Sequence, residues 1–110
     1  MTQMEAQIIE LLTKLKTNTI LFKDVIDFIE QHLDHTPTAF KNGATFNEAN
    51  QNQGSAKVFR FAQLNNLSQA DTLALFAEHY HAVLEHPEGA DHQNIRQFMA
   101  NGWSGIEWSN

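Results

Sequence analysis

The chain contains no cysteine, and only seven of its 110 residues are lysine or arginine. The absence of cysteine excludes disulfides, thiolate nucleophiles and cysteine-ligated zinc or iron–sulfur sites. The few basic residues are spread along a chain of net charge -6, so they form no cluster of the kind that binds nucleic acid or anionic membranes. Apolar runs are only a few residues long, so no membrane-spanning segment is expected. The N-terminus also lacks the basic and apolar regions of a secretory signal peptide.

The composition is typical of one small globular domain covering residues 1–110. Hydrophobic residues make up 42% of the chain, and eight of them are phenylalanine, so we expect an aromatic core. No long repeat or low-complexity tract interrupts the chain.

Two amphipathic helices are predicted in the first third of the sequence. Thr2 and Glu5 have the spacing of a capping box, and the apolar stripe that follows predicts a helix to about Lys16. A second stripe begins at Phe22 and has to end before Pro37, because proline disfavours the helical conformation in the residue before it.

A short β-hairpin is predicted near residues 38–47. Asn42-Gly43 is a strong two-residue turn signal because both residues tolerate positive φ. Segments 38–41 and 44–47 flank it, each with one phenylalanine. The amide-rich segment 47–54 is expected to be a loop.

Three further helices are expected after this loop. Ser55 is predicted to cap a helix over residues 56–65, although 58–61 also suits a strand. Ser68, with Asp71 three residues later, starts a helix predicted to run to about Glu85. Asp91 is predicted to cap the last helix, which ends at Gly102. Residues 106–108 are a short strand or an extended tail. The predicted fold is therefore mainly α, with about five helices and one hairpin.

The first candidate site is the segment that contains Asp91, His92, Asn94 and Arg96. A histidine beside a carboxylate is suited to acid–base chemistry, and an arginine one turn further along binds oxyanions. The structural alternative is that Asp91 caps the helix, His92 satisfies a buried carbonyl and Arg96 clamps the hairpin or the C-terminal tail.

The second candidate site is the amide-rich loop with Asn47, Asn52, Ser55 and Lys57. These residues suit a polar ligand at the start of a helix, where backbone N–H groups favour anions and Lys57 adds positive charge. The alternative is that the amides only fix the loop and cap the helix.

The six histidines show no His-Glu-x-x-His spacing, so we expect scattered surface histidines and no metal. No nucleotide-binding or nucleophile-elbow motif occurs, and no cofactor is expected.

The chain resembles the HopJ family, whose members are described as bacterial type III effectors. The matching segments are collinear and cover nearly the whole chain: residues 36–43, 47–49, 51–55, 57–59, 61–64, 67–68, 72–76, 80, 87–89, 91–99 and 102–106. The resemblance implies a stand-alone domain, delivered by a type III secretion system into a host cell, and supplies no activity or cofactor. The family pattern often has a cysteine where this chain has Ala56, so no thiol-dependent role is expected there.

Three functions are consistent with these observations. The one we favour is a binding or interaction module for an unidentified protein or small molecule. The second is a small cytoplasmic domain with a metabolic or stress role. The third is an enzyme in which His92 is the acid/base, Asp91 orients it, and Lys57 or Arg96 holds an oxyanion.

Cytoplasmic residence is expected as well as export, because a helix predicted from Thr2 leaves little chain for an unfolded export signal. Trp103 and Trp108 are expected to pack on the core or to form a homodimer contact.

Overall fold

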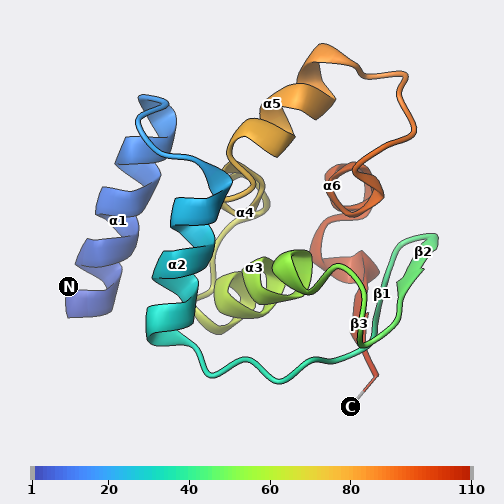
Figure 1. Cartoon of the computed structure of the whole chain (residues 1–110), viewed down its shortest axis with the longest axis horizontal. Coiled ribbons are helices and arrows are strands. Elements are labelled where there is room, and N and C mark those ends of the chain that lie inside the picture. Colours follow the sequence, from blue (N-terminus) through green and yellow to red (C-terminus); the bar gives the residue numbers. More distant parts are fainter. Residues whose placement is uncertain (1, 110) are drawn as a thin grey trace.

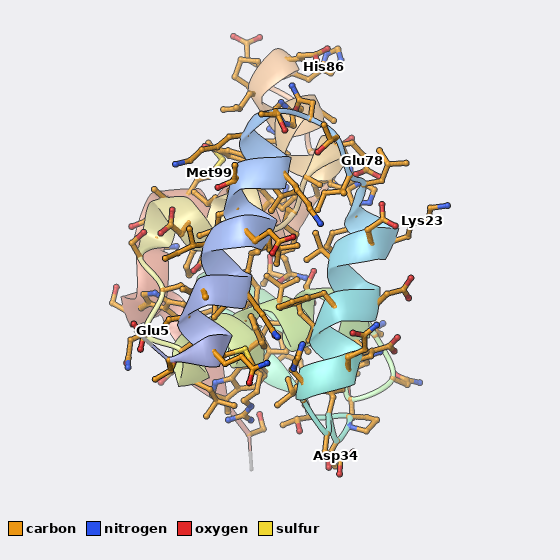
Figure 2. All side chains as sticks on the ribbon, turned by 90° about the vertical axis from the view of Figure 1, so that its left-hand side faces the viewer. Glu5, Lys23, Asp34, Glu78, His86 and Met99 are labelled. Atoms are coloured by element: carbon orange, nitrogen blue, oxygen red, sulfur yellow. The ribbon has the colours of Figure 1, made fainter. Side chains whose placement is uncertain are left out.

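The computed structural model describes residues 2–109. Helix α1 spans Gln3–Lys16 and begins with the predicted capping box. The Glu5 N–H donates to the Thr2 hydroxyl at 3.0 Å, and the Glu5 carboxylate accepts the Thr2 N–H. Helix α2 spans Phe22–His32 and ends before Pro37, as predicted. The two helices lie side by side at one end of the molecule (Figures 1 and 2).

The hairpin is present, but its turn lies one residue later than predicted. Strand β1 spans Phe40–Asn42 and β2 spans Thr45–Asn47, with Asn42 paired to Thr45. The connecting residues are therefore Gly43 and Ala44, and the positive φ of 58° falls on Gly43. Because Asn42 belongs to the strand, its side chain is buried instead of lying in an exposed turn.

Helix α3 spans Gln53–Leu64 and begins earlier than predicted. Asn52 is the N-terminal cap and has a left-handed conformation with φ 50°, which asparagine tolerates better than most residues. The prediction that Ser55 caps this helix is wrong, since Ser55 lies within the first turn. The helical assignment of residues 58–61 is confirmed over the strand alternative.

The long helix predicted between Ser68 and Glu85 is divided into two. Helix α4 spans Gln69–Ala74, with the Ser68 hydroxyl accepting the Asp71 N–H at 3.1 Å, and α5 spans Glu78–Glu85. The chain turns between them, and Ala77 has φ 52°. The turn buries Leu75 as well as its neighbours in the core, which the single stripe of a continuous helix cannot do. Residues 2–109 consequently form six α-helices where about five were predicted.

Helix α6 spans Gln93–Asn101 and is followed by a 3-10 turn at Gly102–Gly105. Its N-terminal cap is His92, with φ 51°, so the prediction that Asp91 is the cap is wrong. Gly102 ends the helix as predicted, with φ 61°, a conformation that favours glycine. Strand β3 spans Ile106–Trp108 and pairs antiparallel with β1, which gives a sheet in the order β2-β1-β3.

The core is aromatic, as the composition predicted, and lies between the helices and the small sheet. Phe59 on α3 is fully buried, and its ring centroid lies 4.9 to 6.3 Å from those of Phe40, Phe76, Phe98 and Trp103. Distances of this size are typical of favourable aromatic pairs. The sheet lies beside α6 at the end of the molecule opposite α1 (Figure 1), and this arrangement brings the hairpin to the start of α6.

Candidate functional site

Four asparagines connect the hairpin to the first turns of α3 and α6. This asparagine cluster consists of Asn42, Asn47, Asn52 and Asn94, the first two fully buried and Asn94 7% exposed. The Asn94 Oδ1 atom accepts from Asn42 at 3.1 Å and from Asn47 at 3.0 Å. The Asn47 Oδ1 atom accepts from Asn94 at 3.0 Å and from Asn52 at 2.7 Å. Buried amides are stable when paired in this way, so the cluster locks the three segments together.

A pocket of about 360 Å³ lies over this cluster. Its walls come from the starts of α2, α3, α5 and α6, together with β2 and the turn before α5: Phe22, Thr45, Asn52, Gly54, Ser55, Phe76, His79, His92, Gln93, Asn94 and Ile95. Both sequence-predicted candidate sites contribute to it, Asn52 and Ser55 from one and His92 and Asn94 from the other. Asn47 lies beneath, bonded to Asn94 and Asn52.

Two histidines and a phenylalanine form one wall of the pocket. The ring centroids of His79 and His92 are 5.1 Å apart, and that of His79 is 5.0 Å from Phe22 in an edge-on arrangement. Phe22 in turn stacks on Phe76 at 5.9 Å. The expectation of scattered histidines therefore misses this pair. No sequence signal marks it, because the two residues are thirteen positions apart and meet only when α5 packs against the start of α6.

The first turns of α3 and α6 supply part of the lining of the pocket. The first N–H groups of any helix have no acceptor within the helix, and neither Asn52 nor His92 bonds to them through its side chain. The lining residues Gly54 and Ser55 of α3, and Gln93 and Asn94 of α6, belong to these turns. The pocket therefore combines amide, hydroxyl, imidazole and backbone groups.

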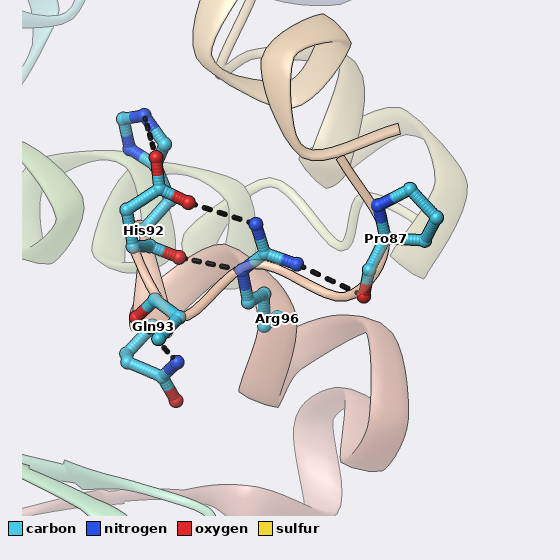
Figure 3. Close-up of polar contacts among 6 residues, drawn as sticks. Pro87, His92, Gln93 and Arg96 are labelled. Carbon is cyan, nitrogen blue, oxygen red and sulfur yellow. Dashed lines mark hydrogen bonds and ion pairs between the residues drawn. The ribbon is translucent and has the colours of Figure 1, made fainter. Parts of the chain in front are cut away.

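Arg96 makes a separate set of contacts with the loop before α6 (Figure 3). The Arg96 guanidinium donates to the Asp91 carboxylate at 2.8 Å, to the Asp91 carbonyl at 2.6 Å and to the Pro87 carbonyl at 3.3 Å. The Arg96 side chain is only 12% exposed. Arg96 is thus a clamp, but on the loop before α6 and not on the hairpin or the C-terminal tail.

His92 and Asp91 do not form a close pair. The His92 Nε2 atom lies 3.9 Å from the nearer Asp91 oxygen, beyond hydrogen-bond distance. Lys57 is directed elsewhere and donates to the Glu30 carboxylate of α2 at 2.9 Å. Lys57 and Arg96 are therefore both occupied by partners outside the pocket.

The tryptophans lie on the core of their own chain. The Trp103 ring lies 5.0 Å from that of Phe98, and its N–H donates to the Leu67 carbonyl at 3.1 Å. Trp108 packs on Phe40 and under the Arg60 guanidinium, which lies 3.9 Å from its ring centroid. Of the two roles expected for these residues, packing on the core is the one that the structure shows.

The pairing with Arg96 holds the pKa of the Asp91 carboxyl below its ordinary value, with a further contribution from His92. We expect Arg96→Gln to raise this pKa back toward its ordinary range, because it removes the hydrogen bond to the ionised form. The pKa of Asp91 is measured by carbon-detected NMR of the carboxyl group. Lys57→Gln is the control, since it breaks a different ion pair and leaves Asp91 unchanged.

The lowered pKa also sets the pH range in which the pair stabilises the fold. The folded-state pKa lies below that of the unfolded chain, so the contribution is complete above about pH 4, the ordinary range of aspartate. It is lost as the pH falls through the folded-state value. If the Asp91 pKa does not rise in Arg96→Gln, the contacts with Arg96 are not the cause of its lowered value.

Within residues 2–109, no group of three or more His, Asp or Glu side chains is arranged to hold a metal ion. No helix in the same range is long and apolar enough to cross a membrane.

The family model described as HopJ type III effector protein matches residues 8–110. The crystal structure of a protein of unknown function, VPA0580, is similar to this chain with a TM-score of 0.83 and 46% sequence identity. The similarity covers 92% of this chain and 87% of that one. No curated protein sequence matches the chain at a significant level.

Proposed function

We propose that this chain, which belongs to the HopJ family, is a binding module whose pocket over the asparagine cluster holds a small polar ligand. The observation that carries the proposal is the convergence of residues from four helix starts and the hairpin on one open pocket. The effector and cytoplasmic alternatives concern where such a module acts, and the pocket favours neither.

The size and chemistry of the pocket support a small ligand. A volume of about 360 Å³ lies at the lower end of the range of roughly 300–1,000 Å³ usual for small-molecule sites. Its lining offers donors and acceptors in the amides of Asn52 and Gln93 and in the Ser55 hydroxyl, and apolar surface in Phe22 and Phe76. Sites of this kind use a few placed polar groups to orient a ligand.

The asparagine cluster supports the proposal by making the pocket rigid. Asn94 is both a lining residue and a member of the cluster, and its side chain is held by Asn42 and Asn47. A site whose side chains are already locked loses less conformational entropy when it binds. A clamp alone would also join these segments, but it would not require a cavity above them.

An enzymatic role for His92 is less well supported by the same geometry. A general base needs an orienting partner within hydrogen-bond distance, and Asp91 lies 3.9 Å away and is bonded to Arg96. Neither Lys57 nor Arg96 faces the pocket to hold an oxyanion. Binding therefore explains more of the arrangement than catalysis does.

The proposal is tested with ¹H–¹⁵N NMR spectra of the protein in the presence of mixtures of small metabolites. We expect at least one compound to shift the amides of Gly54, Ser55, Gln93 and Asn94 together, because these groups line one pocket. Ser55→Met fills the pocket and is expected to weaken this binding at least tenfold, which corresponds to about 1.4 kcal/mol.

Ser109→Met is the matched control. Ser109 is exposed in the C-terminal tail, outside the pocket, and the same substitution there leaves binding unchanged. A broad set of compounds that never shifts the pocket amides, or equal weakening by both variants, overturns the proposal.

A further inference from the structure

The charged and ionisable side chains around the pocket are distributed unevenly. The chain has 13 acidic residues and a net charge of -6, yet none of the pocket-lining residues is acidic. The lining also has no lysine or arginine, and the two imidazoles, those of His79 and His92, are the cationic type of side chain that it contains. A lining without carboxylates does not itself repel a ligand of negative charge.

We propose that this pocket binds the oxyanion group of a small molecule, a phosphate or a carboxylate, beside the paired imidazoles of His79 and His92 and within reach of both. The inference rests on the proposed function, because it names the class of ligand that the same pocket takes. The inference specifies the charge of the ligand, its position in the pocket and the pH dependence of its binding.

The spacing of the two rings carries the argument. Their centroids are 5.1 Å apart, so two protonated imidazoles repel one another unless an anion lies close to both. An anion in that position converts the repulsion into attraction, and each ring also supplies an N–H donor. Phe22 packs against His79 in a T-shaped arrangement and places apolar surface beside this wall, which strengthens the interaction.

Other residues that carry donors line the same pocket as the histidines. They are Ser55, with its hydroxyl, and residues in the first turns of α3 and α6, where backbone N–H groups have no acceptor within the helix. They add neutral donors to a site whose charge comes from the histidines.

Two carboxylates adjoin the histidines, and both have other partners. Asp91 lies 3.9 Å from His92 and accepts a hydrogen bond from Arg96. Glu78, next to His79 in the chain, accepts the Phe22 N–H at 2.7 Å. Imidazoles in general take up a proton between about pH 8 and pH 5. An anion that binds the protonated form must therefore bind more tightly as the pH falls through this range.

The experiment is an NMR titration of the full chain with sodium sulfate or sodium acetate, at pH 6.0 and pH 8.0, with ionic strength held constant by sodium chloride. Both probes keep their charge between these pH values. We expect saturable shifts of the Gly54, Ser55, Gln93 and Asn94 amides, with at least fivefold tighter binding at pH 6.0. A preference for sulfate assigns a phosphate-type ligand, and a preference for acetate assigns a carboxylate.

The variants test the role of the histidines. In His79→Gln/His92→Asn, affinity at pH 6.0 falls at least tenfold and the pH dependence disappears. Asparagine is chosen at position 92 because it tolerates the left-handed backbone there. His86→Gln is the control, since His86 is exposed at the far end of α5, outside the pocket (Figure 2), and it behaves like the unmodified protein.

The unmodified protein alone decides the inference if the double variant does not fold. Absence of saturable shifts with both anions, or equal affinity at the two pH values, overturns it. If uncharged metabolites shift the pocket amides while both anions do not, the binding function stands and the oxyanion inference falls. If neither the uncharged metabolites nor the anions shift the pocket amides, the proposed binding function and the oxyanion inference are both wrong.

Discussion

Asn47→Ala is expected to lower the free energy of unfolding by about 2–4 kcal/mol, because it breaks the asparagine cluster at its centre. The Asn47 side chain is fully buried and exchanges hydrogen bonds of 3.0 Å in both directions with Asn94. Its removal leaves the Asn94 Nδ2 group buried without an acceptor. An orphaned buried group of this kind costs about 1–3 kcal/mol, in addition to the hydrogen bonds lost.

The measurement is urea unfolding, followed by circular dichroism, of Asn47→Ala beside Asn50→Ala. Asn50 is exposed in the loop after β2, so its replacement is expected to change stability by less than about 0.5 kcal/mol. If the two variants are equally stable, the cluster does not hold the hairpin to α6 as described. A separate loss of ligand binding in Asn47→Ala at temperatures where it is folded would connect the cluster to the pocket.

Phe59→Ala is expected to cost about 3–5 kcal/mol, the largest effect of any single substitution considered. Phe59 is fully buried and its ring contacts aromatic rings from β1, the turn after α4, α6 and the 3-10 turn. Truncation removes these contacts and leaves a cavity that four separate segments have to close. A loss of this size is a large part of the stability of a domain of this length.

Phe46→Ala is the matched control for this prediction. Phe46 is 55% exposed on β2, so the same substitution there is expected to cost less than about 1 kcal/mol. Thermal unfolding of both variants measures the difference. A cost below about 2 kcal/mol for Phe59→Ala contradicts its place at the centre of the core.

Features that depend on neighbouring residues were well predicted by the sequence. The capping box at Thr2, the cap at Ser68 and the end of the last helix at Gly102 all rest on contacts within one turn of the chain. The residue types at these positions favour the backbone conformation of a helix start or a helix end. The sequence also predicts the hairpin, but with its turn one residue too early, because Asn42 as well as Gly43 suits a turn.

The errors arose where packing overrides a local signal. Asp91 and Ser55 are good capping residues, but the helices begin at His92 and Asn52 instead, with left-handed backbones and no side-chain cap. Asp91 is engaged by Arg96, and the earlier start of α3 places Asn52 where it bonds Asn47. The division between α4 and α5 similarly follows from the burial of Leu75. Leu75 would lie off the apolar stripe of one continuous helix, so the pattern of the stripe does not predict the division.

The sequence by itself determined the family, the mainly helical class, the aromatic core and the two segments in which polar residues gather. These features can be predicted because each of them depends on composition or on spacings of a few residues. Only the tertiary structure decided that the two segments share one pocket, that Lys57 and Arg96 turn away from it, and that His79 joins His92. Most of those relations depend on helices and strands that meet across separations of 13 to 52 residues, and no local pattern shows which faces will meet.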